Sequence, residues 1–394
     1  MKRLLQDFVQ SLGMNARKSL LILLLVWIFS IVLIYLYFHR GDNLIDNTNV
    51  NSGKNDLRTN VYITPTRSPM VDHTKDVTVT NLINDHDIIN NNLPQTNFIK
   101  PGILTPTQVE KVETIKLHTV TYATHGGKDD RFCRAVESAI RHNFELIILG
   151  WGEKWLGLSQ KLTGAYNYIK ALPPKDVILF TDAFDVLYTD EPDNILQKFL
   201  SAKTEILFSA ECGCWPHVME DRDVCFNKYP KSPTPYRYLN SGTWIGYAKP
   251  AADMLLQIIK EAGNDFTNAN DQKLVADFYI NGRFGIKLDF HNLIFQSMHM
   301  TLDPPLPHCN PVEDVIKTPE NKWKNKLTNS LPSVFHFNGG GKQHHLQMEK
   351  QMWYKIPENN DLIHKNNLAD YFILVPTNVN GKLRFKDICP AYIH

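Results

Sequence analysis

The sequence predicts an α/β fold in which a mostly parallel sheet is covered by helices on both faces. Strand-like and helix-like segments alternate four times from about residue 116 onward, which is typical of right-handed crossovers between parallel strands. The chain has 394 residues, 43% hydrophobic and 21% charged, enough for one large core or two smaller ones. A formal net charge of +1 gives no general attraction for nucleic acid, so function must depend on a local site.

One segment near the N-terminus is apolar enough to cross a membrane. In Leu20–Phe38, Ser30 is the only polar side chain apart from two tyrosines, and the segment is long enough to span a bilayer as a helix. Arg17 and Lys18 precede it, which places the N-terminus in the cytoplasm. We expect a single-pass type II membrane protein of the endoplasmic reticulum or Golgi with the remainder lumenal; a cleaved signal peptide is the alternative.

The residues on either side of this segment carry no sign of a packed core. Residues 1–19 would form a cytoplasmic tail. Residues 39–115 are rich in Asn, Asp and Thr, with scattered Pro and no sustained periodicity, which is typical of a flexible stem. We therefore expect the ordered domain to begin near Lys116.

Six cysteines would lie on the outer side of the membrane, in an oxidising compartment. They are Cys133, Cys212, Cys214, Cys225, Cys309 and Cys389. We expect some of them to pair, in a connectivity that the sequence does not give. A zinc site formed by the three middle cysteines and His217 is the alternative, but its spacing fits no common zinc motif.

The elements of the predicted domain follow one another in a regular order. "LHTVTYAT" and "FELIILG" predict strands, and "DRFCRAVESAIRHN" between them places Phe132, Ala135 and Val136 on one helical face. A second helix leads into a strand that ends at Thr181. "EPDNILQKFL" predicts a third helix with Pro192 in its first turn, and "EILFSAE" predicts the next strand.

Two aspartates follow the third predicted strand, in "DVILFTDAFDVLY". Side chains three apart on a strand point to opposite faces, so Asp182 and Asp185 converge only if the chain turns at Thr181. Open α/β sheets bind ligands beyond the carboxyl ends of their strands, and convergent carboxylates there favour a hard divalent cation. A plain surface turn is the alternative. No G-x-G-x-x-G follows the first strand and no P-loop motif occurs, which disfavours dinucleotide enzymes and P-loop NTPases.

Seven motifs then occur in one order between about Lys116 and Met352. They are "VTYATHGGKDDRFCRAVESA", "ILGWGEKWLG", "DVILFTDAFDVLY", "LFSAECGCWP", "YLNSGTWIGYA", "NDQKLVADFY" and "FHFNGGGK". Together they resemble the N-terminal glycosyltransferase domain of the multifunctional procollagen lysine hydroxylase and glycosyltransferase family. The resemblance implies a GT-A-type Rossmann-like fold over residues 116–355 that binds a UDP-sugar with Mn2+. Residues 356–394 form a C-terminal extension outside the match, which we expect to add an edge strand.

The resemblance also implies which residues hold the metal. They are Asp182, Asp185 and His336, and His336 can reach the aspartates if "SVF" is a strand ending at the same sheet edge. A cation there would stabilise the charge on departing UDP, and Lys342 would add a second positive charge.

Further candidates surround this site by the same resemblance. The catalytic candidates are Asp271, Lys342 and Asn240. Candidates for contacts with the donor are Thr124, Lys161, Asp182, Phe184, Ser241, Gly242, Gln272, Asn338 and Gly339. Asp271 would position the acceptor hydroxyl or the sugar and accept a proton, unless it only caps the following helix. Phe184 would stack on uracil or belong to the core, and Lys161 could be an ordinary solvated lysine.

Three positions depart from the pattern of the family. Asn270 replaces an acidic residue before Asp271, Gly164 replaces an aromatic residue, and no proline follows Asn338 and Gly339. The iron site of the family's hydroxylase half has no candidate, because no H-x-D or H-x-E pair occurs.

We therefore expect a metal-dependent glycosyltransferase that transfers glucose or galactose from a UDP-sugar to a hydroxyl acceptor. The acceptor would be hydroxylysine-linked or another protein glycan, and configuration would be retained. The alternatives are a carbohydrate- or protein-binding module on the same fold and a sugar-nucleotide hydrolase.

Overall fold

The computed structural model describes residues 114–126, 130–302, 306, 308–356 and 368–392. Across these residues, no helix combines the length and the apolar character that crossing a membrane requires. This finding counts against the single-pass type II membrane protein of the endoplasmic reticulum or Golgi that we expected, and that assignment is corrected accordingly. The apolar segment Leu20–Phe38 on which it depended lies outside the described residues, as do the expected tail and nearly all of the stem.

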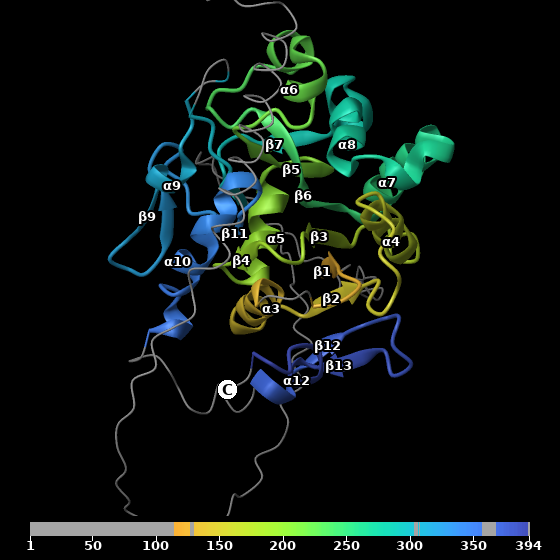
Figure 1. Ribbon diagram of the computed structural model, residues 1–394, viewed down its shortest axis with the longest axis vertical. Coiled ribbons are helices and arrows are strands. Elements are labelled where there is room, and N and C mark those ends of the chain that lie inside the picture. Colours follow the sequence, from red (N-terminus) through yellow and green to blue (C-terminus); the bar gives the residue numbers. More distant parts are fainter. Residues whose placement is uncertain (1–113, 127–129, 303–305, 307, 357–367, 393–394) are drawn as a thin grey trace, which may run out of the picture. The chain divides into compact units, whose positions relative to one another are not determined.

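A central sheet of eight strands organises the described residues (Figure 1). Its order is β13-β12-β2-β1-β3-β6-β5-β7. The bounds are β1 Leu117–Tyr122, β2 Leu146–Leu149, β3 Val177–Thr181, β5 Ile206–Glu211, β6 Tyr238–Tyr247, β7 Lys287–Asp289, β12 Phe372–Leu374 and β13 Lys382–Arg384. All run in one direction except β6 and β13, which are antiparallel to their neighbours. The predicted α/β fold with a mostly parallel sheet is confirmed. The exception in the middle of the sheet is β6, which runs antiparallel to both of its neighbours.

Helices pack on both faces of this sheet, as predicted. One face carries α4 (Gln160–Ile169), α7 (Ala248–Ala262) and α8 (Asp271–Ile280); the other carries α3 (Arg131–Arg141) and α5 (Pro192–Ser201). Strand β3 shows why both faces need cover. Its Ile178 and Phe180 join the first of these cores, whereas Val177 and Leu179 join the second, since successive side chains on a strand point to opposite faces.

Shorter elements complete the description. The short α-helices are α6 (His217–Glu220), α9 (Pro311–Asp314), α10 (His345–Glu349) and α12 (Phe385–Ile388). A π-helix covers Val224–Lys228, and 3-10 helices cover Gly263–Asn268, Arg283–Gly285, Gly339–His344 and Trp353–Lys355. Strands β9 (Val315–Lys317) and β10 (Trp323–Asn325) form a two-stranded sheet.

A separate three-stranded sheet carries the predicted histidine. Its order is β4-β11-β8, with β4 Val186–Tyr188, β8 Phe295–Ser297 and β11 Val334–His336. The segment "SVF" therefore enters a strand as predicted, but that strand does not belong to the main sheet. His336 instead reaches the aspartates because it pairs with Val186, the residue after Asp185.

The C-terminal extension packs against the edge of the main sheet. β12 runs parallel to β2, and β13 is antiparallel to β12 at the outer edge, which confirms the expected edge strand. Cys133 on α3 is joined to Cys389 after α12, so the extension is also held covalently.

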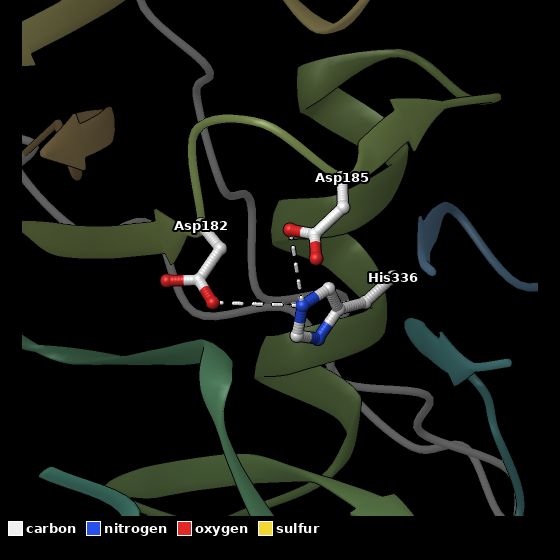
Figure 2. A group of neighbouring side chains, drawn as sticks. All are labelled: Asp182, Asp185 and His336. Atoms are coloured by element: carbon white, nitrogen blue, oxygen red, sulfur yellow. Dashed lines mark ion pairs between the residues drawn. The ribbon is translucent and has the colours of Figure 1, made fainter. Parts of the chain in front are cut away.

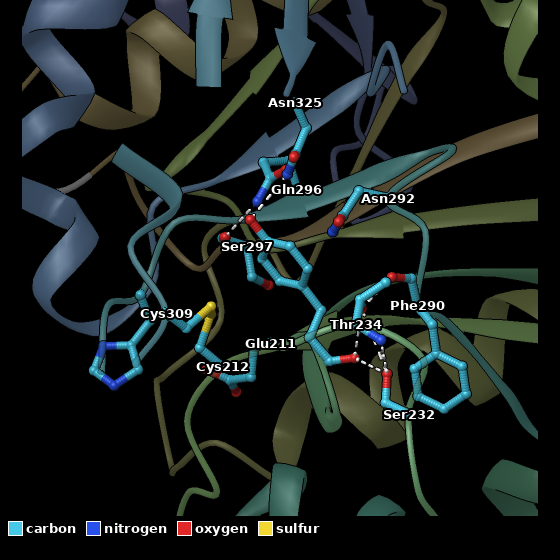
Figure 3. Close-up of a disulfide and its surroundings, with 12 residues drawn as sticks. Glu211, Cys212, Ser232, Thr234, Phe290, Asn292, Gln296, Ser297, Cys309 and Asn325 are labelled. Carbon is cyan, nitrogen blue, oxygen red and sulfur yellow. Dashed lines mark hydrogen bonds between the residues drawn. A yellow bond between two sulfur atoms is a disulfide. The ribbon is translucent and has the colours of Figure 1, made fainter. Parts of the chain in front are cut away.

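The other four cysteines surround the end of β5. They form the disulfides Cys212–Cys309 and Cys214–Cys225, and Figure 3 shows the first of these directly after Glu211. All six cysteines of the chain are thus paired. The expected disulfides are confirmed, and no zinc site forms among these cysteines.

Candidate functional site

Two aspartates and one histidine converge beyond the end of β3 (Figure 2). Asp182 follows β3 and Asp185 precedes β4, so the chain turns between them, as predicted. His336 Nε2 lies 3.5 Å from Asp182 Oδ2 and 3.4 Å from Asp185 Oδ1. One ligand atom from each residue lies within 4.8 Å of the others. Two carboxylate oxygens and an imidazole nitrogen at this spacing fit a divalent metal.

The electrostatics of this triad favour positive charge. Burial opposes ionisation of Asp185, but His336, Lys342 and Lys161 outweigh it and lower the pKa of Asp185 to about 2. Burial would lower the pKa of His336, yet Asp185 and Asp182 raise it. Lys342 Nζ lies 3.5 Å from Asp185 Oδ2 and its side chain is half exposed, so this ammonium group stands at the open side of the triad.

Lys161 links the triad to the predicted acidic residue on α8. Its Nζ lies 2.8 Å from both Asp182 Oδ1 and Asp271 Oδ2, and the lysine is 8% exposed. Despite burial, the two carboxylates raise the pKa of Lys161. Lys161 is therefore a buried cation between two site aspartates, not a solvated lysine.

Asp271 is not the cap of α8. The N-cap is Asn270, whose Oδ1 accepts a hydrogen bond from Lys273 N at 3.0 Å. This also explains the departure at residue 270, since asparagine is a strong N-cap. The Asp271 carboxylate is thus free of the capping role, and it faces Lys161 and Ser241 Oγ, the latter at 3.2 Å.

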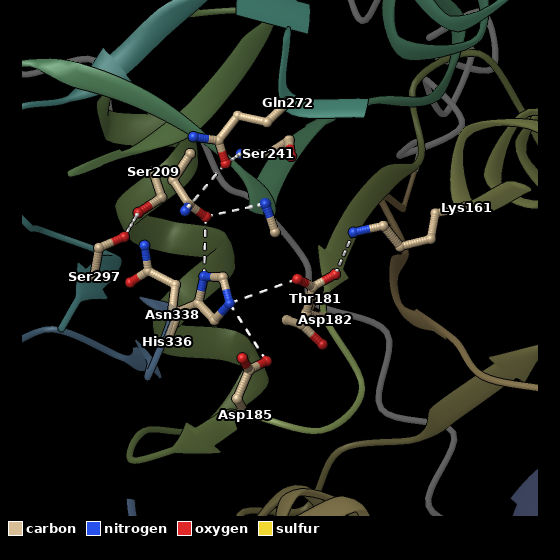
Figure 4. Close-up of polar contacts among 12 residues, drawn as sticks. Lys161, Thr181, Asp182, Asp185, Ser209, Ser241, Gln272, Ser297, His336 and Asn338 are labelled. Atoms are coloured by element: carbon tan, nitrogen blue, oxygen red, sulfur yellow. Dashed lines mark hydrogen bonds and ion pairs between the residues drawn. The ribbon is translucent and has the colours of Figure 1, made fainter. Parts of the chain in front are cut away.

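A bulge in β6 shapes the next part of the site. Phe208 on β5 pairs with Trp244, but the next residue, Ser209, pairs with Asn240. Ser241, Gly242 and Thr243 are therefore unpaired on the β5 side, which is the signature of a β-bulge. The predicted turn-like Asn-Ser-Gly segment lies inside a strand. Asn240 Oδ1 lies 2.9 Å from His336 Nδ1, and the Gly242 carbonyl accepts from Asp182 N, with Ser241 between these two residues (Figure 4).

Gly242 leaves no room for a side chain. A Cβ at this position would lie 2.7 Å from Asp182 Oδ2 and 3.0 Å from His336 Nδ1. Gly242 also accepts a hydrogen bond at its carbonyl from Asp182 N, at 2.6 Å. Asp182 and His336 can therefore occupy their present positions only because residue 242 is glycine.

Gly242→Ala should weaken divalent metal binding by about tenfold or more, because either Asp182 or His336 must move. Such overpacking should cost roughly 1–3 kcal/mol of unfolding free energy. Gly340→Ala is the matched control, since a Cβ there meets only His299 Nδ1, at 3.9 Å. Mn2+ titration of both variants gives the comparison. Unchanged affinity in Gly242→Ala would contradict the steric argument.

Two residues of the site escaped the sequence reasoning. Glu211, the last residue of β5, is buried and accepts hydrogen bonds from Asn240, Gln272 and Asn338. Burial raises the pKa of Glu211, against the effect of these bonds. His299 lies beside Gly339, where a Cβ would meet its Nδ1 at 2.6 Å. The only sequence signal for Glu211 was its position as a carboxylate at the end of a predicted strand. The sequence around His299 gave no signal of a functional role.

The remaining predicted residues are less closely joined to the triad. Thr124 is buried, and its carbonyl accepts from Gly152 N at 2.9 Å. Phe184 is partly buried, with its ring 5.6 Å from that of Phe132, so it borders the core. A Cβ at Gly164 would overlap the ring of Tyr122, so an aromatic side chain from β1 fills the space beside this departure.

Comparisons with known proteins relate the chain to one family. The family described as the PLOD GT domain matches residues 113–355. Procollagen-lysine,2-oxoglutarate 5-dioxygenase from Drosophila melanogaster is 34% identical over 197 residues, which cover 47% of this chain and 26% of that protein. The multifunctional procollagen lysine hydroxylase and glycosyltransferase LH3 from Homo sapiens is 28% identical over 242 residues, 58% of this chain and 30% of that protein.

A viral relative and a solved structure complete the comparisons. The uncharacterized protein R699 of Acanthamoeba polyphaga mimivirus is 28% identical over 224 residues, 54% of this chain and 43% of that protein. The chain thus spans less than half the length of these three relatives. The galactosyltransferase LgtC, solved with donor and acceptor sugar analogues, matches with a TM-score of 0.35 and 12% identity over 59% of this chain and 96% of that chain, too weakly to support an argument.

The matched residues make up more than half of the chain and include every residue of the site described above. The resemblance seen in the seven motifs is therefore confirmed, and the described structure is a glycosyltransferase-like domain. The chain belongs to the PLOD GT domain family.

Proposed function

We propose that this chain is a Mn2+-dependent glycosyltransferase that transfers glucose or galactose from a UDP-sugar to a hydroxyl group. The observation that carries the proposal is the convergence of Asp182, Asp185 and His336. A carbohydrate- or protein-binding module would have little need for three metal ligands. The name of the human relative LH3, which includes glycosyltransferase activity, supports the same reading.

The triad would hold Mn2+, which when bound would neutralise the diphosphate and stabilise the charge on departing UDP. Lys342 stands at the open side of the triad and would add positive charge for the same purpose. Thr124 and Phe184 would lie near the nucleotide, and Asn338 and Gly339 would also contact the donor.

The donor sugar would lie between the triad and α8. The sugar would be lined by Asn240, Ser241, Gly242 and Gln272. Lys161, which contacts both Asp182 and Asp271, would hold these two carboxylates in fixed positions. Asp271 would orient the sugar or the acceptor hydroxyl and take up its proton. We propose retention of configuration, by attack on the same face from which UDP departs.

The acceptor would be hydroxylysine-linked galactose, another protein side chain or a glycan. The transfer domain would extend over residues 116–355, with residues 356–394 as its extension. Both proposals rest on the family resemblance.

UDP release by the full-length chain tests the proposal. The protein is incubated with a panel of UDP-sugars, with Mn2+ and with EDTA. Mn2+-dependent release from UDP-glucose or UDP-galactose is expected, with the sugar appearing on an added hydroxyl acceptor. Free sugar alone, whatever acceptor is offered, would indicate a hydrolase. UDP and Mn2+ binding without any release would leave the binding module.

A further inference from the structure

One buried carboxylate joins three segments of the site. Glu211 is 1% exposed. Its Oε1 accepts from Asn240 Nδ2 at 3.0 Å and from Gln272 Nε2 at 2.7 Å, and its Oε2 accepts from Asn338 Nδ2 at 2.7 Å. These amides belong to β6, to α8 and to the segment after β11. All three partners donate, so both carboxyl oxygens of Glu211 act as hydrogen-bond acceptors.

These bonds fix the orientation of the Asn240 amide. With Nδ2 turned to Glu211, Oδ1 points the other way, where it lies 2.9 Å from His336 Nδ1 and accepts from Gly242 N at 3.0 Å. The glycine N–H supports the same orientation from the opposite end of the amide. The Glu211 carboxylate and this N–H thus hold Asn240 between them.

The amide in turn decides where the neutral His336 ring carries its proton. A carbonyl oxygen only accepts, so Nδ1 must be the donor and Nε2 must be the unprotonated nitrogen. Nε2 is the atom that faces Asp182 and Asp185. The lone pair that a metal needs is therefore directed into the triad.

We propose that Glu211 is a positioning residue for this metal site: it acts through Asn240 to hold His336 in the tautomer that offers Nε2 to a divalent cation. The inference rests on the proposed function, because it takes the triad as the place of the cation. Substitution of a residue that orients a metal-bound imidazole in this way typically weakens metal binding by about 10–100-fold.

The backbone around Glu211 is suited to this role. Glu211 pairs with Tyr238 on β6, and Cys212 and Cys214 just after it are both in disulfides. Figure 3 shows the first of these next to Glu211. The backbone of Glu211 is thus fixed by strand pairing on one side and by disulfides at the following residues on the other.

A double-mutant cycle on the full-length chain tests the proposal. Mn2+ affinity is measured by electron paramagnetic resonance for wild type, Glu211→Met, Asn240→Ala and the double variant. Methionine keeps the volume of glutamate but accepts almost no hydrogen bonds. We expect each single variant to bind Mn2+ about tenfold more weakly, and the double variant to be within about threefold of Asn240→Ala, because both act on one pathway. Wild-type affinity in Glu211→Met, or losses that multiply, would overturn it.

The tautomer itself gives a readout that a merely structural role would not move. In EDTA, above the pKa of the ring, 15N spectra of labelled histidines should show the His336 proton on Nδ1 in wild type and a mixture in both single variants. A wild-type proton on Nε2 would overturn the proposal. If wild type binds no Mn2+, the proposed function fails, while this spectrum still decides the inference.

Two further variants guard the interpretation. Ser209 lies on the same strand as Glu211, two residues before it, and its hydroxyl forms a buried hydrogen bond with Ser297 on β8. Ser209→Ala removes this bond and should keep wild-type Mn2+ affinity. If Glu211→Met does not fold, Glu211→Gln replaces it in the same cycle. Glutamine keeps one acceptor oxygen, so a loss of at least about threefold that is non-additive with Asn240→Ala is expected, and an additive or absent loss would overturn the proposal.

Discussion

Asp185→Ala should weaken Mn2+ binding by at least about 100-fold and reduce sugar transfer to roughly 1% of wild type or less, because it removes one of three protein ligands. Substitution of residues that only orient metal ligands already weakens metal binding by about 10–100-fold, so the loss of a ligand itself should cost at least as much. The carboxylate is ionised at neutral pH, since His336, Lys342 and Lys161 lower its pKa against the effect of burial. Its loss also leaves Lys342 without its partner at 3.5 Å. Calorimetric titration with Mn2+ and UDP release together measure both effects.

The matched control is Asp193→Ala, which removes an exposed aspartate from the first turn of α5. It should keep both Mn2+ affinity and sugar transfer. If Asp185→Ala retained Mn2+-dependent transfer at the level of this control, the two aspartates would only form a turn, and the metal would have to bind elsewhere.

Lys161→Met should destabilise the domain by about 3 kcal/mol, the lower end of the range for breaking a buried ion pair. The substitution leaves Asp182 and Asp271 facing each other, and their side chains are only 23% and 6% exposed. The lower end applies because Asp182 retains some contact with solvent. For a domain of this size the melting temperature should fall by roughly 6–12 °C, as measured by circular dichroism.

Lys170→Met, at the exposed end of the same helix, is the control and should change the melting temperature by no more than about 2 °C, since exposed lysines contribute little. Sugar transfer by Lys161→Met should also fall, because both aspartates lose their fixed positions. A variant as stable as the control would mean that the two carboxylates share a proton or separate without the lysine.

Two of the three residues of the candidate metal site could be predicted from the sequence alone. The spacing of Asp182 and Asp185 after an apolar strand predicted a turn with two carboxylates at a ligand-binding edge. His336 could not be found in this way, because it comes from a different sheet and meets Asp185 only through the pairing of β11 with β4. It entered through the family resemblance alone, and its route to the site was predicted wrongly.

The part of the candidate site around β6 was harder to predict, because its residues contradict local sequence preferences. Asn240, Ser241 and Gly242 suggest a turn, yet they lie within β6, where the pairing on both sides outweighs turn preference. Glu211 gave no signal because its three amide partners come from segments far apart in the chain. A buried carboxylate can be recognised only once the donors that satisfy it have been brought together.

The Cys133–Cys389 disulfide links two positions 256 residues apart and closes the backbone between them into a ring. Asp182, Asp185 and His336 all lie inside this ring, and a cut between residues 185 and 336 would fall between the two aspartates and the histidine. A single cut would therefore yield two polypeptides that still travel as one molecule, with both halves of the triad held by the sheets and by the bond. Separation would require a reductant, so a nicked sample would pass unnoticed on a non-reducing gel.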